Sequence, residues 1–359
     1  MDLRPLTADA APGLLALHRE CPIEADLSFY LDRSPDFFAW PAAIFDSFAY
    51  VGGFEGDALV ACALLGTAAG EGCPGGTFSF AGDVRVAPGA RGRGFSRRAA
   101  AALAPLAVSS GLTLGLVKRG NAAAYRAAAA LARSGFDITT LCEYRVANLL
   151  LVGSAPSPAR CRVRRARQGD LPLLADLMGR ASRGRPFAPP GEPESLSRDL
   201  ARLPGLALED FYLAFAGGEP AGALGAWDAG PLRRAVVLRY SWRGRMARLG
   251  YALARRLRPA IAPAPRTGQC LRAVTTTRVA VPGGDPAVLH DLLAAVYRDR
   301  TGNGYHLIQL GLAASDPLLA AVRGFPRQTL ASDLVLVTAS GVPVPGRLAG
   351  PPHLDLRYV

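Results

Sequence analysis

The chain repeats one series of landmarks twice, and this internal repeat restricts its fold more than any other feature. The series is a short strand with a Pro-led helix, a hairpin with a Gly-acidic turn, a strand ending in Pro-Gly, and a Gly-Phe pair before a last strand. The first half has these at Leu3-Arg4 with Pro12, Gly56-Asp57, Pro88-Gly89 and Gly135-Phe136. The second half has them at Val163-Arg164 with Pro172, Gly218-Glu219, Pro282-Gly283 and Gly324-Phe325. The repeat predicts two domains of one α/β (α+β) fold, each with a mixed, mostly antiparallel sheet flanked by helices.

The two halves meet in a segment of small residues and prolines, Gly153-Ser154-Ala155-Pro156-Ser157-Pro158. Such a composition is typical of a linker between domains. We therefore predict domains at residues 1–153 and 162–359, with a linker at 154–161. The length of 359 residues agrees with two domains. The second half is longer because it carries an insertion between its hairpin and its Pro-Gly strand.

Composition excludes several functions. The net charge is +12, but Lys118 is the only lysine, and an excess of arginine in a chain rich in Ala, Gly and Pro is typical of GC-rich coding DNA. This total charge does not by itself predict a nucleic-acid partner. The six cysteines form no C-x-x-C pair, which favours reduced thiols over a disulfide framework or a metal site. The sequence shows neither an apolar stretch long enough to span a bilayer nor a leader at Met1, so we expect a cytoplasmic protein.

The segment from Val86 to Ser96 is the sharpest local feature. It reads Val86-Ala87-Pro88-Gly89-Ala90-Arg91-Gly92-Arg93-Gly94-Phe95-Ser96, between a strand that ends near Val86 and a helix that begins near Phe95. Glycines in such a turn let successive backbone N–H groups approach an anion at the helix N-terminus. Arg91 and Arg93 would add charge, and a pyrophosphate is the natural ligand. The same spacing is also found in ordinary Gly-rich turns, so the loop alone leaves both readings open.

This loop resembles motif A of the GNAT superfamily of N-acetyltransferases, with Ser96 in place of the usual last glycine or alanine. Asn121, Ala124 and Gly135-Phe136 resemble the family's motif B. The resemblance implies that the chain binds acetyl-CoA or another acyl-CoA as a co-substrate, without a metal. It also implies that the backbone of Val84, Arg85 and Val86 pairs with the pantetheine arm. The amides of Gly92, Arg93, Gly94, Phe95 and Ser96 would bind the pyrophosphate, and Asn121 would lie near the cofactor.

Two residues are candidates for proton transfer. Asp83 matches an acidic position that the family often uses on this strand, as a base or to bind a cationic substrate; it is equally well a polar residue on a solvent-facing side. The family's usual tyrosine acid would fall at Leu131, and Tyr125 lies on the same predicted helix, about a turn and a half earlier. Tyr125 is therefore a candidate acid, with a packing role as the alternative. The aromatic residues of 27–45 would line the acceptor pocket or belong to the core.

The second half lacks the phosphate loop. Asp285 stands where an arginine would help, and Pro286 removes an amide donor. This half therefore resembles a GNAT domain that has lost coenzyme A binding, with a structural or substrate-shaping role. A homodimer through it stays open.

A basic amphipathic helix is predicted in the insertion of the second half. Trp242, Met246, Leu249, Leu253 and Leu257 recur at helical spacing among arginines over residues 242–258. We expect this helix to pack its apolar side on its own domain, with a solvated arginine face. An anionic membrane surface, an acidic partner and an acidic substrate are the alternatives, but we expect neither a membrane nor a nucleic acid as partner.

These features together predict an acyl-CoA-dependent N-acyltransferase, with acetyl as the first acyl group to test. Its acceptor would be the amine of a small molecule or of a peptide, which attacks the thioester directly in a ternary complex. The alternative is a non-catalytic protein that binds coenzyme A as a sensor or an interaction module.

Overall fold

The computed structural model describes residues 1–341 and 350–359. The first half contains these helices and strands: β1 (Asp2–Leu6), α1 (Ala11–Glu20), β2 (Leu27–Asp32), α2 (Ala39–Ile44), β3 (Ser47–Glu55), β4 (Ala58–Ala69), β5 (Thr77–Val86), α3 (Phe95–Ser110), β6 (Thr113–Lys118), α4 (Ala122–Ala132) and β7 (Phe136–Leu150).

The second half follows a similar order with an insertion. Its elements are β8 (Arg162–Arg165), α5 (Leu171–Ser182), α6 (Pro193–Arg202), β9 (Phe211–Ala216), β10 (Glu219–Trp227), β11 (Arg234–Tyr240), α7 (Trp242–Leu257), β12 (Cys270–Leu271), β13 (Ala273–Ala280), α8 (Pro286–Arg300), β14 (Leu307–Ala313) and β15 (Arg327–Ala339). The predicted insertion is the segment from β11 to β12, with the basic helix α7 in its middle. Among the described helices, none is both long and apolar enough to cross a membrane.

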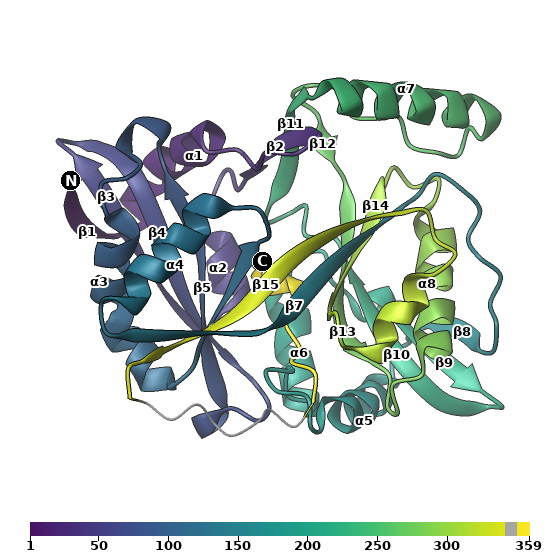
Figure 1. The fold of residues 1–359 in the computed structure, drawn as a ribbon. Coiled ribbons are helices and arrows are strands. Elements are labelled where there is room, and N and C mark those ends of the chain that lie inside the picture. The colour runs from purple at the N-terminus through teal and green to yellow at the C-terminus, as the bar shows by residue number, and fades with distance from the viewer. Residues whose placement is uncertain (342–349) are drawn as a thin grey trace.

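The strands of both halves join into one sheet of 12 strands, in the order β1-β3-β4-β5-β6-β15-β7-β14-β13-β10-β9-β8. Most neighbours run antiparallel; β5 with β6 and β13 with β14 are the parallel pairs, one in each half. Helices cover the faces of the sheet (Figure 1). The predicted fold class, a mixed and mostly antiparallel sheet flanked by helices, is confirmed.

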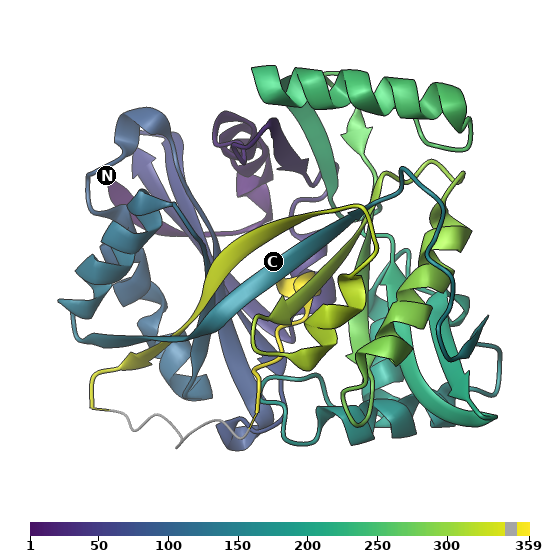
Figure 2. The ribbon, with the colours of Figure 1, turned by 45° about the vertical axis from the view of Figure 1, so that its right-hand side comes forward.

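The two halves exchange their last strands. β15, from the end of the second half, lies between β6 and β7 of the first, and β7 in turn lies between β15 and β14 of the second. The two strands pair antiparallel from Arg327 with Leu149 to Ala339 with Phe136. They form the long ribbon that crosses the middle of the molecule in Figures 1 and 2. Sequence spacing predicted a last strand for each half but not this exchange.

A smaller sheet makes a second link between the halves. β2 of the first half pairs antiparallel with β11 of the second, which also pairs with β12. The hydrophobic core is shared in the same way. One cluster of buried side chains contains Leu14 and Phe78 of the first half together with Trp227 and Tyr358 of the second. Neither the backbone pairing nor the core therefore divides at residues 154–161, which connect β7 to β8.

The strand exchange predicts that the halves depend on each other for folding. Residues 1–153 alone would leave the facing edges of β6 and β7 unpaired and part of the core exposed, so we expect them to be insoluble or to unfold without cooperativity. Co-expression of 1–153 with 154–359 should give a complex that copurifies and unfolds in one transition. Affinity purification and thermal unfolding followed by circular dichroism make the comparison. A separate fragment 1–153 that unfolds cooperatively as a monomer would contradict this dependence.

Candidate active site

The turn between β5 and α3 has the geometry of an anion cradle. β5 ends at Val86 and α3 begins at Phe95, as predicted. Gly92 and Gly94 have φ angles of +80° and +75°, which glycine adopts without strain. A Cβ atom built on either glycine would meet nothing within 4 Å, so the space beside the loop is open. The two glycines thus set the path of the turn and leave its surface accessible.

The backbone of this turn presents free donors. The N–H groups of residues 92–97 make no hydrogen bond to any described residue, and Arg98 N is the first amide here that bonds back, to Gly94 O at 3.4 Å. They are the unpaired amides that every helix start leaves, supplemented by those of the loop. Together with the positive end of the α3 dipole they favour a phosphate group.

The two loop arginines are not equivalent. Arg91 lies on the surface, and its Nε donates to Val86 O at 3.3 Å. The Arg93 guanidinium pairs with Glu55 and donates to Gly89 O at 3.0 Å. The sequence predicted both as phosphate ligands, but Arg93 already has a carboxylate partner. Both members of that pair are partly exposed, so the ion pair is weak enough to exchange for a phosphate.

β5 and β6 part next to this loop. Their parallel pairing covers only Ser79–Ala81 with Thr113–Gly115. Beyond it, β5 stays with β4 as far as Val86, while β6 stays with β15 as far as Lys118. The side of Val84 to Val86 that faces β6 therefore has no strand partner, and the Val84 side chain is 48% exposed. An extended chain could pair with the backbone there as an added strand.

Asp83 lies at a bulge of β5 and is buried. Its φ is +54°, an uncommon value for a residue with a side chain. The carboxylate accepts hydrogen bonds from Arg33 Nη1 and from the Tyr50 hydroxyl, each at 2.7 Å, and His18 Nε2 lies 3.4 Å away. The side chain is only 4% exposed, so the reading of Asp83 as a solvent-facing residue is wrong.

The charges around Asp83 fix its protonation state. Burial alone would raise the pKa of Asp83, but the Arg33 guanidinium holds it well below its usual range, with help from His18 and Arg85. Burial also lowers the pKa of His18, although Asp83 opposes the change. Asp83 is therefore a permanently ionised carboxylate at neutral pH, which makes it a poor proton acceptor.

Tyr125 and Asn121 lie at the start of α4. The Asn121 side chain caps the helix by accepting from Ala124 N at 3.1 Å, so its oxygen is already engaged. The Tyr125 side chain is 37% exposed, and its hydroxyl donates to Asp333 Oδ2 at 2.6 Å. This hydrogen bond raises the pKa of Tyr125, which keeps the phenol protonated at neutral pH. Tyr125 is thus at the surface rather than in the core, and the partner of its hydroxyl comes from β15 of the second half.

The corresponding loop of the second half is closed to an anion. Asp285 caps α8 by accepting from Ala287 N at 2.9 Å and pairs with Arg160 at 2.8 Å. The carboxylate takes the place a phosphate would need, and Pro286 has no N–H to donate.

The opening between β13 and β14 is also occupied. These strands pair only over Ala273–Thr275 with Leu307–Gln309. Where they part, Asp355 accepts from Thr277 Oγ1 at 2.7 Å and from Arg278 N at 3.0 Å. The short helix Leu356–Tyr358 contacts both strands. A segment of the chain itself therefore lies where the first half keeps an opening.

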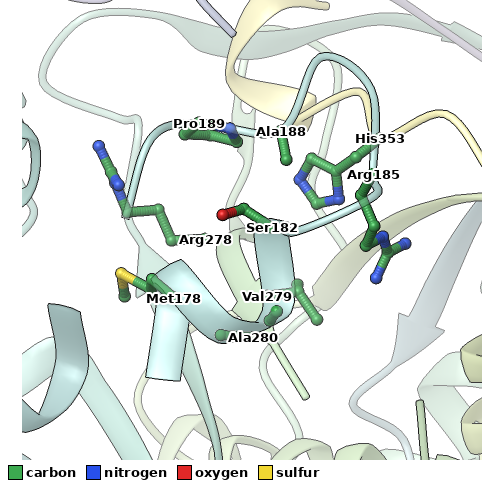
Figure 3. Close-up of a pocket in the computed structure, with 10 residues that line it drawn as sticks. Met178, Ser182, Arg185, Ala188, Pro189, Arg278, Val279, Ala280 and His353 are labelled. Atoms are coloured by element: carbon green, nitrogen blue, oxygen red, sulfur yellow. The ribbon is translucent and has the colours of Figure 1, made fainter. Parts of the chain in front are cut away.

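The second half also contains a small cavity beside Arg278 (Figure 3). Ser182 of α5, Arg185 and His353 line it together with Arg278, and its volume is about 20 Å³. This is room for a single water molecule rather than a substrate. Burial lowers the pKa of His353 to about 3, so the imidazole is neutral. The cavity is thus part of the packing of this half.

The partners of Asp83 were not predicted from the sequence. Arg33 and Tyr50 lie far from Asp83 along the chain, and no local pattern connects them. Of the aromatic residues expected to line an acceptor pocket or to belong to the core, Phe37, Trp40 and Phe45 are core residues with 2% exposure or less. Arg33 stacks on two of them, with its guanidinium carbon 4.9 Å and 4.0 Å from the ring centres of Phe37 and Trp40. A buried arginine next to an aromatic cluster is visible only in three dimensions.

Comparison with known proteins agrees with this geometry. The sequence model of the acetyltransferase (GNAT) family matches residues 12–136. A GCN5-related N-acetyltransferase from Sphaerobacter thermophilus is 13% identical and has a TM-score of 0.58, with 99% of this chain and 98% of that chain covered. A tandem GNAT protein from the clavulanic acid biosynthesis pathway is 14% identical with a TM-score of 0.58, and 96% and 99% of the two chains are covered. No curated protein matches the chain in sequence.

The fold is similar to that of solved GNAT proteins, one of which is a tandem GNAT protein. The family match places a GNAT domain at residues 12–136, in the N-terminal half, and the C-terminal half follows a similar order of helices and strands with an insertion. The family match supports acyl transfer as the general activity. At these identities the solved structures show the fold alone.

Because Asp83 is buried among charged partners, we expect its replacement to lower the free energy of unfolding strongly. Asp83→Asn keeps the shape and tolerates the positive φ, but it leaves the Arg33 guanidinium buried without a counter-charge. We expect the free energy of unfolding to fall by about 3–5 kcal/mol, measured by urea titration at neutral pH. Asp176→Asn is the control, because the pair of Asp176 with Arg180 is exposed and should be worth at most about 0.5 kcal/mol.

The difference in stability between the wild type and Asp83→Asn should also depend on pH. Since the pKa of Asp83 is lowered by folding, its contribution is complete above the pKa of the unfolded carboxyl, roughly 4, and is lost as the pH falls towards the folded pKa. The stability difference between the wild type and Asp83→Asn should therefore be constant near neutrality and narrow in acid. A difference that stays within about 1 kcal/mol at every pH would refute the buried ion pair.

Proposed function

We propose that this chain is an acyl-CoA-dependent N-acyltransferase whose N-terminal half binds the acyl-CoA and transfers its acyl group to an amine. Acetyl is the acyl group that we propose first. The amine belongs to a small molecule or a peptide and attacks the thioester directly in a ternary complex. The observation that carries the proposal is the cradle of free amides at residues 92–97 beside the unpaired edge of β5.

The residues of this half fit coenzyme A at both ends of the site. The open space above Gly92 and Gly94 admits phosphate oxygens to the amides, and Arg91 lies on the surface beside it. The free side of Val84 to Val86 would pair with the extended pantetheine arm. Coenzyme A supplies the activated thioester. The described residues of the second half offer neither feature at the equivalent positions, because Asp285 and the segment around Asp355 take both places.

We assign three roles to residues of the chain. Backbone N–H groups at the β5 bulge would stabilise negative charge that develops on the carbonyl oxygen. Asp83 is a positioning residue, since its bonds to Arg33 and Tyr50 hold the bulge in place. The Tyr125 hydroxyl is the proton donor for the leaving thiolate, with Asp333 orienting it. The amine proton passes to solvent water, because Asp83 stays ionised behind its partners.

The binding step is tested by calorimetric titration with acetyl-CoA. The wild type should bind one molecule per chain with a Kd on the order of micromolar. Gly94→Glu should weaken binding by tenfold or more, on the order of 1.4 kcal/mol at least, since a side chain is strained at this φ and the carboxylate repels phosphate. Gly283→Glu is the matched control, because Gly283 has a φ of +84° and equally open space in the loop of the second half.

The outcomes separate the candidate functions. Binding that is lost in Gly94→Glu and kept in Gly283→Glu supports the site, and release of free thiol with a panel of amines then supports the transferase. Binding without turnover of any amine would favour the alternative, a coenzyme A sensor. No binding by the wild type would exclude both.

The role of Tyr125 is tested by Tyr125→Phe. If its hydroxyl protonates the thiolate, kcat should fall by about a hundredfold while the Kd for acetyl-CoA stays unchanged. Tyr240→Phe is the control, because the hydroxyl of this half-buried residue donates to Pro265 O at 2.7 Å, within the insertion of the second half. A kcat of Tyr125→Phe within about twofold of the wild type would leave Tyr125 no part in proton transfer.

A further inference from the structure

The basic helix α7 packs its more polar side against the body of the protein and exposes its apolar side to solvent. Its N-terminus is fixed to the first half, because Ser241 Oγ donates to Asp26 Oδ1 at 2.8 Å and accepts from Gly244 N at 3.0 Å. Gly244 is buried so closely that an added Cβ would lie 2.1 Å from Asp26 O. Tyr251, nearly two turns later on the same side, is half-buried, and the Arg248 guanidinium stacks over Tyr240 with 5.5 Å to the ring centre. The side of α7 that faces the body thus carries a glycine, a tyrosine and an arginine.

The opposite side of α7 is an exposed apolar stripe. Its five side chains are 60–80% exposed and recur at the spacing that places residues on one helix face: Trp242, Met246, Leu249, Leu253 and Leu257. The helix lies along the edge of the molecule, apart from the main sheet (Figures 1 and 2). The expectation that α7 packs its apolar side on its own domain is therefore wrong. Five large apolar side chains in one row are a contact surface.

Arginines border the stripe on both sides. At 3.6 residues per turn, Arg243 lies along one border, and Arg245 and Arg256 lie along the other. All three side chains are exposed. The sequence of α7 contains no aspartate or glutamate. A surface that accepts this face must be apolar in the middle and negatively charged around it.

A second copy of the chain does not offer such a surface among the described residues. Packing α7 on another α7 would bring arginines against arginines. Outside α7, the exposed large apolar side chains are single residues on separate elements: Val84, Leu106, Tyr125 and Val359. A nucleic acid would match the arginines but leave the apolar row in water.

We propose that α7 is an interfacial helix that binds the surface of an anionic phospholipid bilayer. The apolar stripe would enter the boundary between headgroups and acyl chains, with the helix parallel to the surface. The bordering arginines would contact the anionic headgroups. The glycine at position 244 and the cap at Ser241 hold the helix close to the body, so the stripe faces away from it. This inference does not depend on the proposed acyl transfer.

The test uses vesicle sedimentation with the full chain. We expect it to sediment with vesicles of equal parts phosphatidylglycerol and phosphatidylcholine, to bind pure phosphatidylcholine at least tenfold less, and to lose binding as salt rises. The double variant Leu249→Glu with Leu253→Glu should bind at least tenfold less. Trp40 and Trp227 are buried and Trp242 is 65% exposed, so a blue shift of tryptophan emission on binding reports Trp242. Trp242→Phe should abolish the shift.

Charge controls separate the border arginines from the total charge. The triple change of Arg243, Arg245 and Arg256 to Gln should weaken binding at least tenfold, and it preserves the apolar stripe. The matched control changes three exposed arginines elsewhere to Gln and should bind like the wild type; these are Arg133, Arg180 and Arg198. Equal losses in both triples would show non-specific attraction and overturn the proposal.

Further outcomes would also overturn it. One is a wild type that binds neither kind of vesicle. Another is a dimer by light scattering that the Leu249→Glu, Leu253→Glu variant converts to a monomer, which would assign the stripe to a second copy. Tighter binding to duplex DNA than to anionic vesicles would assign α7 to nucleic acid. Circular dichroism of each variant verifies folding. If the double glutamate variant is unfolded, the triple change of the border arginines to Gln still tests the proposal.

Discussion

The pairing of β7 with β15 is the contact on which the rest of the structure depends. Each of these strands closes the sheet of the other half, and their long antiparallel ladder makes one sheet out of two. The opening of the first half lies between β5 and β6. The other edge of β6 is already paired with β15. The exchange also brings Asp333 to Tyr125. The second half, whose equivalent loop is closed to an anion by Asp285, thus supplies a residue to the candidate site of the first.

The two halves have residues of opposite charge at the same strand bulge. Each bulge has one non-glycine residue with positive φ, Asp83 in the first half and Arg278 in the second. In the first half a buried acid is held by Arg33, whereas in the second a buried arginine is held by Asp199. The opening beside Asp83 remains accessible, and the one beside Arg278 is filled by the segment around Asp355. The first half therefore keeps an open candidate site, whereas the equivalent opening of the second half is filled.

The sequence predicts the parts that depend on local patterns. Strand and helix boundaries around the loop from Val86 to Phe95 follow from glycine, proline and apolar spacing, and the loss of the loop in the second half follows from Asp285 and Pro286. The strand exchange could not be predicted, because alternation along a strand specifies its faces but not its neighbours. The partner of Asp83 is 50 residues away, at Arg33. The predicted orientation of α7 was wrong for a related reason. Periodicity shows that a helix has an apolar side, but it does not show which way that side points.

Hydrogen–deuterium exchange with and without acetyl-CoA tests whether the first half alone holds the acyl-CoA. We expect slower exchange in peptides covering 82–97, where free amides gain phosphate and pantetheine partners. Peptides covering 276–288 should be unchanged, because Asp285 and Asp355 already take the equivalent places. Protection of 276–288, or an unchanged loop at 82–97 under saturating acetyl-CoA, would contradict it.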